Sequence, residues 1–398
     1  MLKFKNIFAL FLFMKIFMDI FSPIRELNLL MEVFIAIIII FSTKRFSILR
    51  KYKSISIMLF TIIYLVISQF DMESIKYFVV VFFFLAVIAA VYSIKLNDLA
   101  ITLKRVSIFS LVCIYLNLIL SIGLGLYSQR MVYNFEHVNL FGTYIVFISI
   151  LFMNSVMLYE KMGMPMSKKR LLIYKLLFVV AAFLTTSTGA FLVQSLIFIP
   201  PKYFSLKRII RLLLICMFGV VFLYYSTDLY LPKLHTKLFG VYDVFQAYSF
   251  SEFYTYSINQ DSKALTQAMD LGGSFVWRLN TYLFYYHQYF NSGILKILFG
   301  GGVATYSDYA YFMPHNDFIA LTLDFGILGL SLIIIFLIKN FKRATEKYYY
   351  PLLYLVIFIC LRLGFENCMY SSYVFSTIIT SMGITLACYQ IYGSSKKV

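Results

Sequence analysis

The sequence predicts an all-α protein that crosses a membrane about twelve times. Of the 398 residues, 61% are hydrophobic and only 13% are charged, whereas a soluble domain devotes about a quarter of its residues to charge. Apolar runs close to the roughly 20 residues that cross a bilayer recur along the chain. Cations gather in every second connection between these runs. A water-soluble globular protein is therefore excluded.

The predicted spans follow from the apolar runs taken in chain order. The first run follows Lys3 and Lys5 as in a signal peptide, but no small-residue cleavage site follows it, which predicts a retained span. The seventh and eighth runs are short and joined by polar residues, which predicts a helical hairpin that does not fully cross. The twelve runs are residues 6–22, 27–42, 55–70, 77–94, 107–126, 139–158, 171–185, 188–201, 209–225, 316–338, 349–365 and 373–391.

The positions of the cations predict the orientation in the membrane. If the amino terminus is cytoplasmic, 25 of the 35 Lys and Arg residues fall on the cytoplasmic side, as the positive-inside rule requires. Both termini are then cytoplasmic. The formal charge of +17 is thereby explained as a topology signal, and a nucleic-acid partner is not predicted. The ten cations left over are Lys15, Arg25, Lys76, Arg130, Lys233, Lys237, Lys263, Arg278, Lys296 and Arg362.

One long connection divides the chain. Helices 1–9 are predicted in residues 1–225, a large extracytoplasmic loop in 226–314, and helices 10–12 in 315–398. Within the loop, apolar residues recur every three or four positions from Ser274, a good cap, until Asn291. This spacing predicts an amphipathic helix lying on or dipping into the outer leaflet. Its apolar residues are Phe275, Leu279, Tyr282, Leu283, Tyr286 and Phe290.

Charged and ionisable residues also predict local interactions. Lys15 and Asp19 lie one helical turn apart in the first span and are expected to neutralise each other. Arg362 lies in the eleventh span, where an arginine must face the protein interior. Four of the ten remaining cations are arginines. These arginines and the four histidines fall on the outer side. Together they predict an outward site that binds an anion and moves protons. The histidines are His137, His235, His287 and His315.

Three segments resemble the O-antigen ligase and polymerase superfamily. The first is "LFGGGVATYSDYAYFMPHNDFIALTLDFGILGLSLIIIFLI", in which a glycine cluster precedes His315 and Asn316 at the head of a long span. The second is Trp277 with Arg278, upstream of that cluster. The third is "RMVYNFEHVNLFG", in which Arg130, His137, Asn139 and Gly142 match and Val138 stands where the family has proline. The "TTSTGAF" hairpin is similar to the family's Ser-rich seventh span.

The resemblance implies a glycosyltransferase C-like fold and an enzyme of the bacterial cytoplasmic membrane with its active site facing outward. Its donor would be an undecaprenyl pyrophosphate-linked oligosaccharide. The activity implied is polymerisation of O-antigen or capsular repeat units by metal-independent transfer with inversion. A ligase that moves the polymer to a lipid A core or another acceptor is the alternative. A flippase ranks third, because two pseudo-repeated halves are not evident. A flippase and a chain-length regulator are candidate partners.

The chemistry of these residues suits that reaction. Arg130 and Arg278 could each hold phosphate oxygens as the pyrophosphate leaves, and His315 could accept the proton of the attacking hydroxyl. No Asp-x-Asp pair and no zinc-type cysteine spacing occur in the chain, so neither a metal nor another cofactor is predicted. The residues predicted to contact substrate are Asn316, Arg362, His137, Asn139, Trp277 and Tyr282.

A structural interpretation of the same residues stays open. Arg278 and Arg130 could each anchor the chain to lipid head groups. Asn316 is a good helix cap and could serve only to begin the tenth span. His137 fits a structural position better than a catalytic one. The outer tyrosines could stack on sugar rings or form the aromatic belt found at membrane interfaces.

Overall fold

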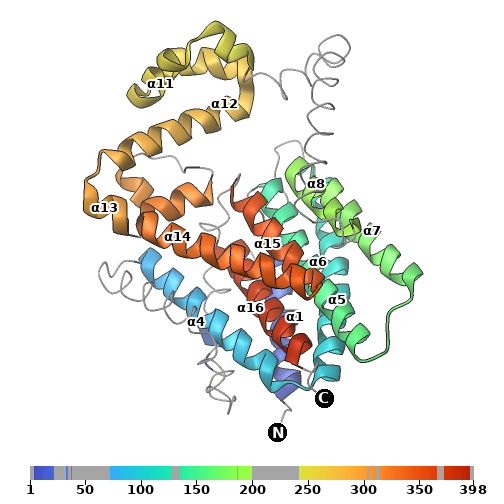
Figure 1. Cartoon of the computed structure of the whole chain (residues 1–398). Coiled ribbons are helices and arrows are strands. Elements are labelled where there is room, and N and C mark those ends of the chain that lie inside the picture. The colour runs from blue at the N-terminus through green and yellow to red at the C-terminus, as the bar shows by residue number, and fades with distance from the viewer. Residues whose placement is uncertain are drawn as a thin grey trace. The chain divides into compact units, whose positions relative to one another are not determined.

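The structure is a computed structural model of the whole chain (Figure 1). It describes residues 4–21, 33–34, 37, 72–126, 135, 137–185, 187–199, 242–302, 305–309, 314, 316–364 and 372–394. Over these ranges the regular elements are all helices. The chain forms two compact units. Unit 1 comprises Met1–Pro201 with Leu332–Val398, and unit 2 comprises Lys202–Ser331.

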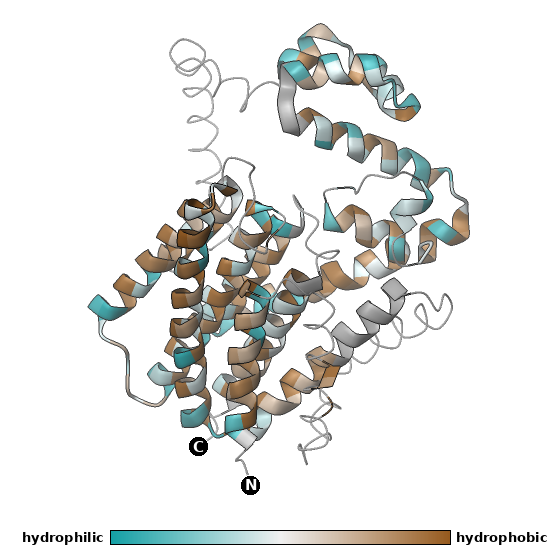
Figure 2. Ribbon diagram, turned by 180° about the vertical axis from the view of Figure 1, so that it is seen from behind, coloured by the Kyte–Doolittle hydropathy of each residue, from teal (hydrophilic) through white to brown (hydrophobic). Residues whose placement is uncertain are grey.

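The described helices confirm a helical membrane protein. Four of them are long and apolar enough to cross a bilayer: α5 (Leu96–Gly123), α6 (Val138–Lys161), α14 (Asp317–Glu346) and α16 (Ser372–Ser394). Apolar residues line these helices along most of their length (Figure 2). Shorter helices match five more predicted spans: α1 (Phe4–Phe21), α4 (Met72–Ser93), α7 (Lys168–Leu184), α8 (Thr188–Ser195) and α15 (Tyr350–Leu363).

The count of twelve spans remains a prediction. The predicted spans over residues 55–70 and 209–225 lie outside the described residues, and so does most of the span over 27–42. The hairpin predicted from the seventh and eighth runs is present as α7 and α8. At 1.5 Å per residue, the eight residues of α8 extend about 12 Å, which is less than the roughly 30 Å hydrocarbon core. That the hairpin does not fully cross stays a prediction.

Helix α6 is the centre of unit 1. Its apolar span is entirely buried, and it packs against α5, α7, α8, α15 and α16. A buried polar group links three of these elements. The Asn154 side chain donates to Thr385 Oγ1 at 2.8 Å and accepts from the Tyr349 hydroxyl at 2.7 Å. Such interhelical hydrogen bonds are the usual polar contacts between membrane helices, where water offers no alternative partner.

The first helix contains the ion pair predicted from its spacing. Lys15 Nζ lies 3.0 Å from Asp19 Oδ2, and both side chains are almost fully buried. Thr377 of α16 donates a further hydrogen bond to the same carboxylate oxygen at 3.1 Å. Two opposite charges that satisfy each other avoid the large cost of an isolated charge in an apolar environment. The prediction that these residues neutralise each other is confirmed.

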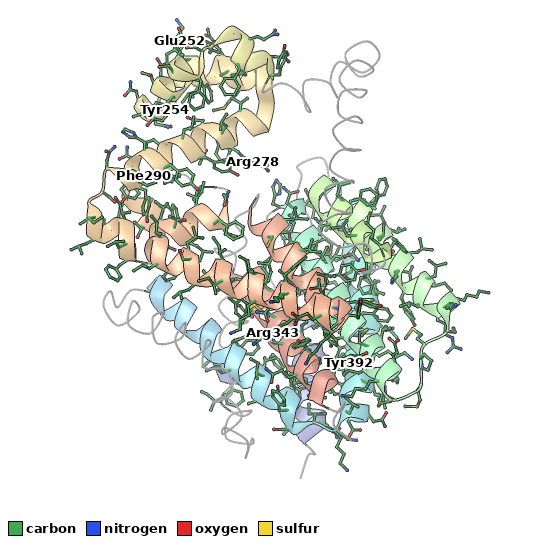
Figure 3. All side chains as sticks on the ribbon, in the orientation of Figure 1. Glu252, Tyr254, Arg278, Phe290, Arg343 and Tyr392 are labelled. Carbon is green, nitrogen blue, oxygen red and sulfur yellow. The ribbon has the colours of Figure 1, made fainter. Side chains whose placement is uncertain are left out.

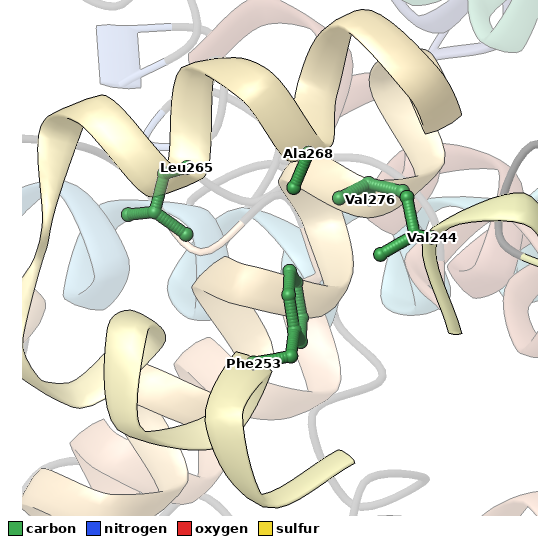
Figure 4. Packing of buried hydrophobic residues seen from close by; sticks show 5 residues of the cluster. All are labelled: Val244, Phe253, Leu265, Ala268 and Val276. Carbon is green, nitrogen blue, oxygen red and sulfur yellow. The ribbon is translucent and has the colours of Figure 1, made fainter. Parts of the chain in front are cut away.

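Unit 2 contains a helical hairpin formed by α11 (Phe250–Asn259) and α12 (Ser262–Phe290). Ser249 and Glu252 form a capping box at the start of α11, and their hydrogen bonds lower the pKa of the Glu252 carboxyl. The hairpin closes over one hydrophobic cluster, which Figure 4 shows from close by. The cluster consists of Val244, Phe253, Leu265, Ala268 and Val276.

The predicted start of the amphipathic helix is wrong. Ser274 lies inside α12, which begins at Ser262 and is capped by Asp261, whose carboxylate accepts from two backbone N–H groups. Gly272 and Gly273 precede Ser274 within this helix, and each glycine weakens a helix by about 1 kcal/mol. Leu265 and Ala268 on one side of them and Val276 on the other all pack into the hairpin core. This shared burial keeps the helix continuous.

The apolar stripe of α12 is partly covered by protein. Leu279 and Leu283 pack against the hairpin core, and Tyr282 packs against a second cluster. A contact of this helix with the outer leaflet stays a prediction. Among the stripe residues whose burial is described, the most exposed are at its end, where Tyr286 is 42% exposed and Phe290 is 60% exposed.

Helix α14 is broken where the glycine cluster meets it. Gly326 has φ 67° and ψ −177°, which interrupts the helix. Two backbone carbonyls before the break accept hydrogen bonds from the glycine cluster. Gly301 N–H donates to Leu323 O at 2.9 Å, and Gly302 N–H donates to Asp324 O at 3.1 Å. The Asp324 carboxylate accepts from Thr305 N–H at 3.0 Å. Backbone groups freed in an apolar span must find such internal partners.

We expect Gly326→Ala to destabilise the protein far more than Gly125→Ala. Both glycines have φ near +68°, which disfavours alanine, and the ψ of −177° places Gly326 in a region that is essentially restricted to glycine, where the strain is about 1–3 kcal/mol. A Cβ at Gly326 would also lie 2.5 Å from Phe299 N, whereas nothing lies within 4 Å at Gly125. The collision adds about 1–3 kcal/mol. Thermal unfolding of the purified protein measures the difference, and equal melting temperatures for the two variants would contradict this account of the break.

Candidate functional site

The best-defined polar cluster in unit 1 surrounds Arg362 of α15. Its side chain is 3% exposed. Arg362 Nε donates to Thr143 Oγ1 at 2.8 Å, and the terminal nitrogen Nη2 donates to the Asn139 backbone oxygen at 3.0 Å. Both acceptors lie in the first turns of α6, within the segment "HVNLFGT". The prediction that an arginine in this span faces the protein interior is confirmed.

The "TTSTGAF" hairpin lies against the same guanidinium. Gly189 is the second residue of α8, and a Cβ placed there would lie 2.5 Å from Arg362 Nη1. At Gly142 of α6, a Cβ would lie 2.5 Å from the Ala190 side chain. Gly142 therefore permits the close approach of α6 and α8, and Gly189 leaves room for the Arg362 guanidinium.

The electrostatics of this cluster favour an anion. The first turns of α6 and α8 both reach the Arg362 guanidinium. A helix amino terminus carries about half a positive charge, and phosphate groups bind readily there. Two such termini beside a guanidinium concentrate positive potential in a mostly apolar bundle. The planar donor fork of arginine also matches pairs of phosphate oxygens. We call this group of residues the Arg362 cluster: Asn139, Gly142, Thr143, Gly189 and Arg362.

His137 and Asn139 are both part of the entry to α6. The His137 ring nitrogen Nδ1 accepts from Asn139 N–H at 3.2 Å, so His137 caps the helix. The backbone oxygen of Asn139 binds Arg362. The structural interpretation of His137 is thus confirmed. Both residues lie at the start of α6, and their role in binding substrate stays a prediction.

The other described candidates lie in unit 2. Trp277, Arg278 and Tyr282 are all half-buried residues of α12. Arg278 and Tyr282 are four residues apart and therefore share one face of the helix. Tyr282 packs against a cluster that includes Ile319 in the first turn of α14. The face of α12 that presents Arg278 is therefore the face next to the start of α14.

Asn316 caps the start of α14, as one of the two interpretations of this residue predicts. Its side-chain oxygen accepts from Phe318 N–H at 2.9 Å and from Ile319 N–H at 3.2 Å. The preceding residue, His315, lies outside the described residues, as does Arg130. Their predicted roles as base and as phosphate ligand stay predictions. The cap places the backbone of residue 316 at the same end of α14 that adjoins α12.

His287 is held on both sides of its ring. Its Nδ1 lies 3.0 Å from the Tyr254 hydroxyl, and its Nε2 lies 3.0 Å from the Asn291 side-chain nitrogen. Figure 3 labels Tyr254 on α11 and Arg278 on α12. With both nitrogens engaged, His287 joins the two helices of the hairpin. It is a structural residue in this arrangement.

Sequence reasoning did not single out Thr143 and Gly189, the two residues that shape the setting of Arg362. A threonine at a buried helical position and a glycine in a Ser/Thr-rich turn both have many ordinary explanations. The usable signal was the intramembrane arginine itself, because a buried guanidinium needs acceptors on neighbouring helices. Asp317 and Asp324, both buried in α14, were also not singled out.

Neither a metal site among the described residues nor a known relative identifies the Arg362 cluster. Among the residues that the structure describes, no three His, Cys, Asp or Glu side chains lie together in a group that could hold a metal ion. No protein-family model matches the chain, and no curated protein matches it.

Thr143→Val should destabilise the protein by about 1–2 kcal/mol. Valine keeps the shape of the side chain but leaves Arg362 Nε without its acceptor in the protein interior. Thr380→Val is the matched control, because Thr380 is also buried and its hydroxyl bonds Ser376 O of its own helix. Thermal unfolding in detergent compares the two variants. A loss at Thr143 no greater than at Thr380 would show that the Arg362 hydrogen bond is not stabilising.

Proposed function

We propose that the protein is a polysaccharide repeat-unit polymerase of the bacterial cytoplasmic membrane. It transfers a glycan from an undecaprenyl pyrophosphate carrier to a hydroxyl of another lipid-linked unit, on the outer face of the membrane. One observation carries the proposal: the guanidinium of Arg362 is buried beside the first turns of α6 and α8. Both turns belong to segments that resemble the O-antigen ligase and polymerase superfamily.

The reaction needs positive charge more than any other group. In the transfer, the bond between the anomeric carbon and the pyrophosphate oxygen breaks while the acceptor oxygen bonds that carbon from the opposite face. The leaving pyrophosphate gains negative charge, and a preorganised guanidinium stabilises it. Arg362 is held in a fixed orientation by two hydrogen bonds. It is therefore ready to meet that charge without reorganising.

Separate residues would serve the remaining steps. Arg278 and Arg130 are the further candidates for the pyrophosphate. His315 takes the proton of the attacking hydroxyl and later releases it to water, and it needs a pKa near the working pH to do so. Asn316, which caps α14, fixes the chain directly after His315. Trp277 and Tyr282 offer aromatic surface for sugar rings beside Arg278.

Deletion of the gene should leave surface glycan that is one repeat unit long. Loss of a polymerase stops chain extension but lets single units reach their acceptor. Gel separation of the surface glycan and extraction of the lipid carriers provide the measurement. Full-length polymer retained on the carrier would indicate a ligase. Single units stranded on the cytoplasmic side would indicate a flippase, and either result would reject the proposal.

Arg278→Ala and Arg362→Ala should each lower chain extension by about 100-fold or more, the usual effect of losing one group that stabilises transition-state charge. Arg362→Lys and Arg278→Lys should remain strongly impaired, because lysine lacks the planar donor fork. Arg170→Ala is the control, since Arg170 is exposed at the start of α7. Glycan length is measured at matched membrane abundance. Normal length distributions in the Arg278 and Arg362 variants would refute their role with the leaving group.

A further inference from the structure

Helix α13 (Ile294–Phe299) of unit 2 has apolar residues on both of its faces. Lys296 is its one polar residue. Ile297 points to one side, where it packs against the cluster of Phe284, Tyr285 and Tyr289. On the other side, Ile294 is 66% exposed, Leu295 is 71% exposed and Phe299 is 54% exposed. A helix that is apolar all round is normally covered on every side, by protein or by lipid.

The exposed side of α13 continues onto its neighbours. Phe290, in the last turn of α12, is 60% exposed, and Ile327 and Leu328 of α14 are 41% and 46% exposed. The helix itself is fixed to α14, because Gly326 lies directly against the backbone of Leu298 and Phe299. The exposed set thus adjoins the break in a helix that is apolar enough to cross a membrane. We call it the α13 surface: Phe290, Ile294, Leu295, Phe299, Ile327 and Leu328.

We propose that the α13 surface lies in the acyl-chain region of the bilayer, so that α13 is a membrane-embedded element of unit 2. Large exposed apolar surfaces mark contacts with protein or membrane. Lipid is favoured here by continuity, since α14 extends the same apolar character along a candidate span. Lys296, also exposed, can extend its ammonium group to the lipid head groups while its stem stays apolar.

This arrangement assigns the lipid contact to a different segment from the one the sequence suggested. The stripe of α12 is partly covered by protein, whereas α13 offers three strongly exposed apolar side chains on a helix of six residues. The inference does not depend on the proposed enzymatic activity. A protein with any function would need the same contact to cover this surface.

Intrinsic fluorescence can test the proposal, because the chain has a single tryptophan. In a Trp277→Phe background, tryptophan is introduced at Leu295 or, as a second position, at Phe299. The full-length protein is reconstituted into phosphatidylcholine vesicles that contain lipids brominated on their acyl chains, which quench tryptophan on contact. Thr255→Trp in the same background is the control, since Thr255 is an exposed residue of α11.

Tryptophan at 295 and at 299 should emit at shorter wavelength than at 255, and brominated lipid should quench both at least about twofold more strongly. Emission typical of water with no excess quenching at either position would overturn the proposal. Blue-shifted emission without quenching would also overturn it, because the surface would then be covered by a second copy of the chain or another protein. Far-ultraviolet circular dichroism of each variant checks that its helices are retained.

Discussion

A polypeptide in an apolar environment must satisfy its backbone hydrogen bonds internally, and this constraint accounts for the irregular parts of the structure. Where α14 breaks at Gly326, Gly301 and Gly302 supply N–H groups to the carbonyls that precede the break. Where α7 gives way to α8, the Ser187 hydroxyl accepts from Ala190 N–H. At these two places, a neighbouring segment in one case and a local side chain in the other supply hydrogen-bond partners for the freed backbone groups. The break in α14 lies beside the glycine cluster, and the turn between α7 and α8 lies beside Arg362.

The positions of most described helices could be predicted from the sequence, because apolar run length is set by bilayer thickness and not by tertiary packing. The Lys15 and Asp19 pair was predictable for a similar reason, since its geometry is local to one helix. The start of α12 was not, because the packing of Leu265 and Val276 on α11 outweighs the glycines between them. The setting of Arg362 also depends on tertiary contacts. Thr143 and Gly189 are 219 and 173 positions away in the chain, and neither has a distinctive local pattern.

Arg362 illustrates how a bundle can hold a charge at low cost. A guanidinium removed from water loses a large solvation energy unless its donors are satisfied. Thr143 and the Asn139 carbonyl satisfy two of them, and both acceptors belong to the first turns of α6. That end of a helix repels a cation, so the hydrogen bonds offset an unfavourable field. An anion bound there would reverse the sign of this field effect, because the guanidinium and the helix termini would then attract the same charge.

The residues behind the family resemblance separate into two physical classes. Gly302 and Gly326 hold the break in α14, Gly142 permits close helix packing, and His137 and Asn316 cap helices. These positions would be needed by any protein that shares the fold, so they indicate architecture and say little about the reaction. The arginines are different, because an ionisable residue placed in an apolar bundle is rare and often marks a functional site. Arg362 and Arg278 therefore support glycan transfer more strongly than the glycine motif does.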